Sequence, residues 1–278
     1  MKKPLTIAVV SEKGGVGKTA TLLNLAGSLV INQNKRVLVV DLNPQQDLST
    51  NLGYVPPSVK TKTISEYIYD QLEGVDFPIV SEEDKKGFIK HTEYGLDYMP
   101  ANRNTLEILP RNLSDSEEDN MCVAKVFEGE MFKNYDFVFV DCKDSLVAHL
   151  VPQILYGVNY AMPITEVGIN SLYDVSEVVK KIYRRYYNVR IIGIVLNKVT
   201  EQSNIAKDLL SSARAEYSEY LFTTQIPDRK AQIEQANNVH LPCVIAKNEH
   251  RKKNTLSEFY SDLAVEFLER IRESEGLQ

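Results

Sequence analysis

A stretch near the N-terminus combines glycines, lysines and a hydroxyl group in the pattern of a phosphate-binding loop. Residues 11–19 are Ser-Glu-Lys-Gly-Gly-Val-Gly-Lys-Thr, and they follow an apolar run at residues 5–10 and precede a helical pattern. In such a loop, glycines let backbone N–H groups converge on phosphate oxygens, a lysine neutralises the β and γ phosphates, and a hydroxyl reaches Mg²⁺. We therefore expect Lys18 and Thr19 to supply the lysine and the hydroxyl, and Gly17 to permit the close approach. A glycine-rich turn without a ligand is the alternative.

Two aspartates stand where apolar runs end, and their position suits a metal that accompanies phosphate. Asp41 follows the run at residues 36–40, and Asp141 follows the run at residues 137–140. Phosphoryl transfer requires a metal to neutralise the phosphates and a group to position the attacking water. Both aspartates are therefore candidates to act on Mg²⁺ or on its waters. Solvated carboxylates at strand ends are the alternative.

The elements that must position these residues follow from an alternation of apolar runs with helical patterns. Unbroken, β-branched apolar runs are typical of strands that are buried on both faces. We predict strands at residues 5–10, 36–40, 137–140, 158–163 and 191–196, with weaker ones near Leu221 and Pro242. Helices are predicted at residues 19–31, 171–187, 204–217 and 257–273. This repetition predicts an α/β fold with a doubly wound, mostly parallel sheet flanked by helices.

The composition is that of an ordinary globular chain, but its overall charge conceals an asymmetry. The 278 residues carry a net charge of −6, 43% of them are hydrophobic, and no apolar run approaches the length of a membrane helix. The three cysteines lack disulfide or metal-ligand spacing, which suits a reducing cytoplasm. Residues 64–131 hold sixteen acidic and six basic residues, a net −10, so the remainder sums to +4. We interpret the acidic region at about 53–131 as an insertion within a single domain that spans residues 1–278.

The loop Lys13-Gly-Gly-Val-Gly-Lys-Thr19 resembles the deviant Walker A loop of the ParA/MinD group of P-loop ATPases. The resemblance extends in order along nearly the whole chain. Residues 36–45 are similar to the strand and switch I of ParA proteins, and residues 135–142 are similar to their Walker B strand. The other matching segments are residues 96–101, residues 194–198, which end near the adenine in the family, and residues 226–227, 234–236 and 241–242.

This resemblance implies a set of site residues, with ATP and Mg²⁺ as the bound cofactors. In the family, the lysine that matches Lys13 reaches across an ATP-sandwiched homodimer to the partner's nucleotide. The residues implied to act on the reaction are Lys13, Lys18, Asp41, Asn43 and Asp141. Those implied to bind the nucleotide are Gly14, Gly15, Val16, Gly17, Lys18, Thr19, Ala20, Asn197, Ile226 and Pro227. Those implied to hold Mg²⁺ are Thr19, Asp41 and Asp141.

Four residues depart from the family pattern near the expected reaction centre. The second switch I aspartate, to which the family assigns orientation of the hydrolytic water, is Asn43 here, and an amide cannot accept a proton from water. Lys143 and Asp144 replace two prolines of switch II, and Asp144 supplies a carboxylate that could partly replace the missing one. Ala20 replaces a frequent threonine. We expect ATP binding to be retained and hydrolysis to be slow or absent.

Two basic clusters are candidates to contact DNA, which ParA proteins bind without sequence preference through basic C-terminal residues. Solvated charged faces are the alternative for both clusters. The last helix carries several glutamates where MinD proteins have a basic, lipid-binding helix, so we expect no membrane partner. The first cluster, at helical spacing, contains Lys180, Arg184 and Arg185, and the second contains Lys247, Arg251, Lys252 and Lys253.

Together these features predict a ParA-like partition protein that binds Mg-ATP, dimerises on ATP and binds nonspecific DNA to segregate a plasmid or chromosome. It would be cytoplasmic and nucleoid-associated, with a ParB-like centromere-binding protein as its regulator. Two alternatives remain open. One is an ATP-dependent scaffold or switch with little turnover, for which Asn43 is the distinguishing feature. The other is a MinD-like positioning ATPase.

Overall fold

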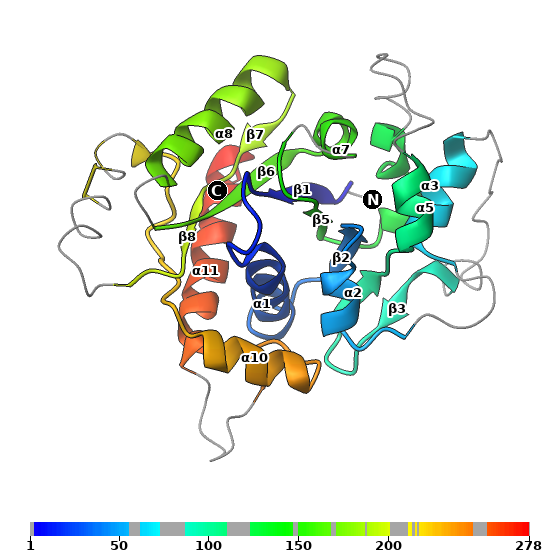
Figure 1. Ribbon diagram of the computed structural model, residues 1–278, viewed down its shortest axis with the longest axis horizontal. Helices are drawn as coiled ribbons and strands as arrows, with labels where there is room; N and C mark the ends of the chain where they lie inside the picture. The colour runs from blue at the N-terminus through cyan, green and yellow to red at the C-terminus, as the bar shows by residue number, and fades with distance from the viewer. Residues whose placement is uncertain are drawn as a thin grey trace.

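The computed structural model has a β-sheet at the centre of the molecule, with helices on both of its faces (Figure 1). It describes residues 3–55, 62–72, 87–109, 123–146, 150–167, 171–186, 188–200, 211–212, 215, 217–246 and 255–277. The strands are β1 (Leu5–Val10), β2 (Val37–Leu42), β3 (Lys90–His91), β4 (Asp97–Met99), β5 (Phe137–Cys142), β6 (Tyr160–Glu166), β7 (Arg190–Ile191) and β8 (Val195–Asn197). The helices are α1 (Lys18–Ile31), α2 (Asp47–Asn51), α3 (Ile64–Leu72), α5 (Arg103–Ile108), η2 (Glu130–Phe132), α7 (Val151–Gly157), α8 (Ser171–Arg185), α10 (Lys230–Asn238) and α11 (Leu256–Ser274).

Within the described residues the strands form one eight-stranded sheet in the order β3-β4-β2-β5-β1-β6-β7, with β8 also paired to β6. Neighbouring strands are parallel except for β3 and β4, which are antiparallel. The predicted doubly wound, mostly parallel sheet is therefore confirmed. Because β1 lies between β5 and β6, the loop that follows β1 lies at the carboxyl ends of the central strands, where sheets of this kind bind their ligands.

Alternate residues of the central strands face two separate apolar cores. Ile7 and Val9 of β1 pack with α1, α10 and α11, whereas Ala8 and Val10 pack with α3, α5, α7 and α8. Every residue of β2 and β5 is buried. This two-sided burial explains why these strands are continuous apolar runs in the sequence, interrupted by Asp41 in β2 and by Asp141 in β5.

Helix α11 covers one face of the sheet with a stripe of apolar side chains at helical spacing. Tyr260, Leu263, Phe267 and Ile271 are all buried. The Phe267 ring lies 5.3 Å from the ring of Phe137 and 5.5 Å from that of Phe139, measured between centroids. The apolar face of α11 is thus used in the core. Among the described helices, none is long and apolar enough to cross a membrane.

Two of the predicted strands differ from the structure, and a third is reduced to an isolated bridge. The strand predicted at 191–196 is two short strands, β7 and β8, because the register against β6 shifts by one residue between the pairs Ala161–Ile191 and Ile164–Val195. Leu221 forms an isolated bridge with Ile194. The prediction of a strand near Pro242 is wrong, since Ile245 and Ala246 both donate to the Pro242 carbonyl and close a turn. Most of the helix predicted at 204–217 lies outside the described residues.

Parts of the acidic region at 53–131 contribute directly to the sheet. Strand β4 pairs in parallel with β2 and carries β3 on its outer edge. Helices α3 and α5 flank these strands, and the side chain of Asn102 caps α5 by accepting from the N–H groups of Asn104 and Thr105. The described part of the region therefore extends the same sheet. Its residues 56–61, 73–86 and 110–122 are outside the described part.

Replacement of Phe267 by alanine is expected to lower the free energy of unfolding by about 3–5 kcal/mol, because it empties space between α11 and β5. Urea unfolding followed by circular dichroism measures this loss. The matched control is Phe259→Ala on the same helix, where the side chain is 39% exposed and the expected loss is about 1 kcal/mol or less. Equal losses in the two variants would contradict the packing described here.

Candidate functional site

The loop between β1 and α1 adopts a conformation that requires glycine. Gly15 and Gly17 have φ angles of +77° and +88°, in the left-handed region that other residues rarely adopt. A Cβ on residue 17 would also overlap the side-chain amide of Asn197, which donates to the Val16 carbonyl at 2.8 Å. Gly17 directly precedes the first residue of α1, so the loop leads into a helix N-terminus. This geometry can place backbone N–H groups around an anion.

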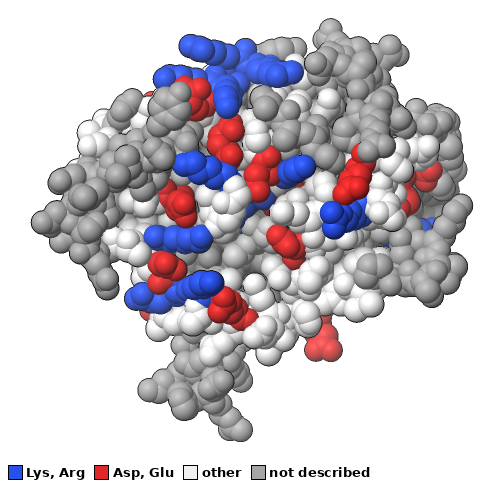
Figure 2. Space-filling model, viewed as in Figure 1, with Lys and Arg blue, Asp and Glu red and all other residues white. Residues whose placement is uncertain are grey.

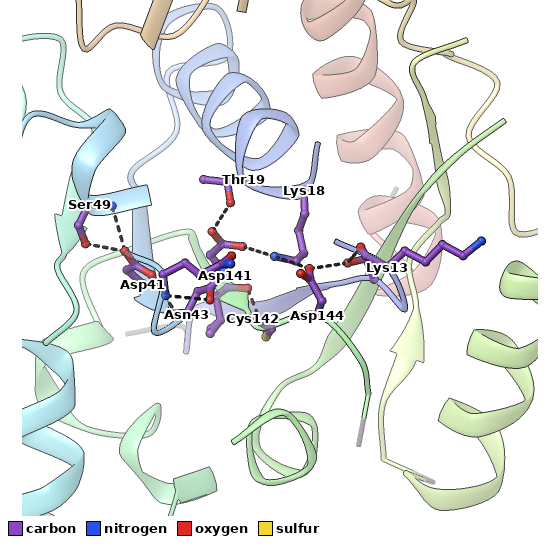
Figure 3. A network of polar contacts seen from close by, with 12 residues as sticks. Lys13, Lys18, Thr19, Asp41, Asn43, Ser49, Asp141, Cys142 and Asp144 are labelled. Carbon is purple, nitrogen blue, oxygen red and sulfur yellow. Dashed lines mark hydrogen bonds and ion pairs between the residues drawn. The ribbon is translucent and has the colours of Figure 1, made fainter. Parts of the chain in front are cut away.

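Lys18 and Thr19, the first residues of α1, both contact the buried carboxylate of Asp141 (Figure 3). Lys18 Nζ lies 3.1 Å from one Asp141 oxygen, and Thr19 Oγ1 donates to the other at 2.7 Å. The Lys18 side chain is 5% exposed and also lies 3.6 Å from an oxygen of Asp144. Burial by itself would lower the pKa of Lys18, but the two carboxylates raise it above its ordinary value. Lys18 is therefore held as a buried cation at the loop.

The second carboxylate, Asp41, is fully buried and paired in register with Asp141 on the neighbouring strand. It accepts hydrogen bonds from the N–H and hydroxyl of Ser49 and from the N–H of Asn43. Burial and the charge of Asp141 raise the pKa of Asp41 to about 7, although these hydrogen bonds oppose the shift. Ser49 lies on α2 and belongs to none of the motifs in the sequence. Its sequence position gives no signal of this contact.

Asn43 is buried beside these carboxylates, and its side chain stabilises its own loop. The Asn43 carbonyl oxygen Oδ1 accepts from the Gln45 N–H at 3.2 Å, and the side chain is 2% exposed. The structure thus brings Lys18, Thr19, Asp41, Asn43 and Asp141 together at one edge of the sheet, as Figure 3 shows. Their roles in binding phosphate and Mg²⁺ and in hydrolysis remain predictions.

Of the other residues predicted to bind nucleotide, Asn197 contacts the loop through Val16, whereas Ile226 and Pro227 contact Leu196 and Val199. Asn197 is the last residue of β8. Ile226 is buried, and its N–H donates to the carbonyl of Leu196. Pro227 follows it in an isolated bridge with Val199. Gly14, Gly15 and Val16 belong to the loop itself, and Ala20 lies in the first turn of α1.

Of the residues predicted to act on the reaction, Lys13 stands apart from this cluster. It is exposed, and Figure 3 shows its side chain directed away from Asp41 and Asp141. The preceding residue, Glu12, is held differently, since it accepts from Lys181 of α8 at 3.0 Å. The loop is therefore tied to α8 through Glu12, while Lys13 extends outward.

The first basic cluster lies at the C-terminal end of α8. Lys180, Arg184 and Arg185 are exposed there, and Figure 2 shows Lys and Arg side chains gathered at the top of the view, over the end of this helix. Lys180 lies 4.0 Å from Glu177, which partly offsets its charge. The residues of the second cluster, Lys247, Arg251, Lys252 and Lys253, lie outside the described residues.

Comparisons with known proteins give a family, related chains and a solved structure of similar fold. A family model described as an AAA domain matches residues 5–192. The sporulation initiation inhibitor protein Soj of Bacillus subtilis is 26% identical over 270 residues, covering 94% of this chain and 96% of Soj. The chromosome partitioning protein ParA of Caulobacter vibrioides is 25% identical over 275 residues, covering 97% and 96%. The crystal structure of Mycobacterium smegmatis cobyrinic acid a,c-diamide synthase, with bound ADP and magnesium, has a similar fold, with a TM-score of 0.71, 19% identity and coverage of 98% and 96%.

The raised pKa of Asp41 predicts how stability varies with pH when nucleotide and metal are absent. Asp41 loses its proton near pH 3.8 in the unfolded chain and near pH 7 in the folded chain. The folded state thus binds more protons between these values, and the free energy of unfolding falls as the pH rises toward 7. An asparagine side chain has no proton to lose. Between pH 5 and pH 8, the free energy of unfolding of Asp41→Asn should therefore rise by about 3 kcal/mol relative to that of wild type.

Urea unfolding at the two pH values, in the presence of a metal chelator, measures this difference. Asp262→Asn, which removes an exposed carboxylate from α11, is the control and should follow the wild-type profile at both values. Parallel profiles for wild type and Asp41→Asn would show that Asp41 is not a protonated, buried group.

Proposed function

We propose that this chain, which belongs to the AAA-domain family and is related to P-loop ATPases of the ParA/MinD type, binds Mg-ATP and acts as a partition protein. The single observation that carries the proposal is the buried contact of Lys18 and Thr19 with Asp141, directly after a glycine loop at the end of β1. A lysine, a hydroxyl and a carboxylate in this order are the groups that a phosphate and its metal require.

The residues present fit a nucleotide accompanied by Mg²⁺. Lys18 would approach the phosphates, the loop N–H groups would donate to them, and Asn197 would border the base. When bound, Mg²⁺ supplies positive charge that offsets the phosphates. Thr19 and Asp141 would hold it together with Asp41. In the described part of the chain, no group of three His, Cys, Asp or Glu side chains is placed to hold a metal ion.

The position of Lys13 supports an ATP-dependent homodimer. Its side chain is exposed and directed away from the carboxylates of its own site. A lysine in this position can reach a phosphate group across a face-to-face interface. We propose that two copies of the chain enclose two nucleotides, with Lys13 of each copy contacting the nucleotide of the other.

The basic cluster of α8 supports binding to DNA. Lys180, Arg184 and Arg185 present positive charge on an exposed surface, which suits phosphate contacts without sequence preference. The relative from Caulobacter vibrioides is named a chromosome partitioning protein. We propose that this chain likewise acts on the nucleoid in the cytoplasm, to segregate a plasmid or chromosome. A ParB-like centromere-binding protein would regulate it.

A scaffold or switch with little turnover is the second candidate, and Asn43 favours it. The amide lies where the family has a carboxylate, and its oxygen is already engaged by the Gln45 N–H. A MinD-like positioning function receives less support, because the apolar face of α11 is buried against the sheet.

The variant Asn43→Asp tests the cause of slow turnover. Restoring a carboxylate restores a group that can orient water and accept its proton, and we expect phosphate release from ATP to rise at least about tenfold. Single-turnover kinetics with Mg-ATP measures the rate. Asn43→Ala supplies no carboxylate and should remain as slow as wild type. Equal rates in Asn43→Asp and wild type would show that this position does not limit hydrolysis.

The double variant of Arg184→Ala and Arg185→Ala tests DNA contact by α8. ATP should shift the wild-type chain from monomer to dimer in analytical ultracentrifugation, and it should promote salt-sensitive retention on arbitrary duplex DNA. The double variant should still dimerise but bind more weakly, and its logarithmic salt dependence should become less steep by about 2, because two phosphate contacts are lost.

Lys230→Ala is the control, since Lys230 is 83% exposed on α10, outside the cluster. Retention that does not depend on ATP would count against the partition mechanism. Retention unchanged in the double variant would exclude α8 as the contact, and the triple replacement of Arg251, Lys252 and Lys253 by alanine would then test the second cluster.

A further inference from the structure

The carboxylate of Asp144 lies against the glycine loop, where it makes three close contacts. Its Oδ1 accepts from the Ser11 hydroxyl at 3.1 Å and lies 3.6 Å from Lys18 Nζ. Its Oδ2 would be 2.9 Å from a Cβ on residue 14, so it packs on the backbone of Gly14. Figure 3 shows Asp144 beside Lys18 at this loop. The groups that it touches belong to the loop that phosphate would enter.

The backbone that carries Asp144 is held in place at a conformational cost. The N–H of Ser145 donates to the Ser11 carbonyl at 2.7 Å, which ties the segment after β5 to the start of the loop. Ser145 has a φ angle of +76°, in the left-handed region that residues with a Cβ rarely adopt. The hydrogen bonds of Ser11 and the attraction of Lys18 hold this conformation. A ligand that replaced those contacts would release the backbone strain.

The local charges make Asp144 a competitor for an incoming phosphate. Lys18 lies between the carboxylates of Asp141 and Asp144, so the charge that a phosphate would use is already shared. A phosphate at the loop would meet the Asp144 carboxylate at close range, and like charges repel. Asp141 is buried at the end of β5, whereas the Asp144 side chain is 31% exposed and lies in a loop, so Asp144 is the one that can move.

We propose that the Asp144 carboxylate is a built-in stand-in for nucleotide phosphate, which must leave the glycine loop before a nucleotide can bind there. This inference rests on the proposed nucleotide site and adds its regulation. Binding of nucleotide is then coupled to displacement of residues 143–146, since the Ser145 N–H and the Asp144 carboxylate both use Ser11. The conformation of residues 143–146, which follow β5, thereby depends on whether nucleotide occupies the loop.

Titration calorimetry with Mg-ADP on the full chain tests the competition. Asp144→Asn keeps the shape of the side chain but removes its charge, and we expect its Kd to fall about tenfold below that of wild type. Asp144→Ala, which also removes the contact with Ser11, should show a similar decrease. Asp262→Asn removes one exposed carboxylate from α11 and should bind as wild type does. Thermal melting of each variant confirms that it is folded.

Hydrogen exchange of the Ser145 amide gives a readout that a purely structural role of Asp144 would not change. In wild type, Mg-ADP should accelerate exchange at this amide, because its bond to the Ser11 carbonyl breaks. Equal affinities for wild type and both Asp144 variants, or unchanged exchange on binding, would overturn the inference and leave the nucleotide site intact. Failure of all the proteins to bind Mg-ADP would instead refute the proposed function, and the inference with it.

Discussion

The site depends on one buried carboxylate, that of Asp141, which is stabilised by two groups from the start of α1. Lys18 approaches one of its oxygens and Thr19 donates to the other, so the loop after β1 is joined to the end of β5. A buried charge without such partners would be costly, and losing either partner would leave that cost uncompensated. The contact therefore fixes the first turn of α1, and with it the direction of the loop N–H groups.

The parallel sheet adds a second constraint, because its register sets Asp41 beside Asp141. Burial of Asp41, together with the repulsion between these two carboxylates, raises the pKa of Asp41 to about 7. Its hydrogen bonds from Ser49 hold the group in place without neutralising it. A divalent cation between these strands would relieve the repulsion. This is the physical reason to expect that folding stability and metal binding are linked at this edge of the sheet.

The parts of the fold that the sequence predicted are those in which local pattern and burial coincide. The strands of β1, β2 and β5 are buried on both faces, so their sequences are continuous apolar runs, and the aspartates near the ends of β2 and β5 could be located in advance. The division of residues 191–196 follows from a one-residue shift of their register against β6, which no local pattern reveals. The contact of Asp144 with Ser11 likewise joins residues far apart in the sequence.

The departures from the family pattern at Asn43 and Asp144 are related, because both change where a carboxylate lies at the site. The family pattern has a carboxylate in switch I and a proline in switch II, whereas this chain has an amide at 43 and a carboxylate at 144. The number of acidic side chains at these two positions is thus unchanged, but the carboxylate has moved from the segment after β2 to the segment after β5. There it contacts Ser11 and faces Lys18 directly. At the nucleotide site that we propose, this carboxylate would oppose an incoming phosphate, so occupancy of the loop would depend on the conformation of residues 143–146.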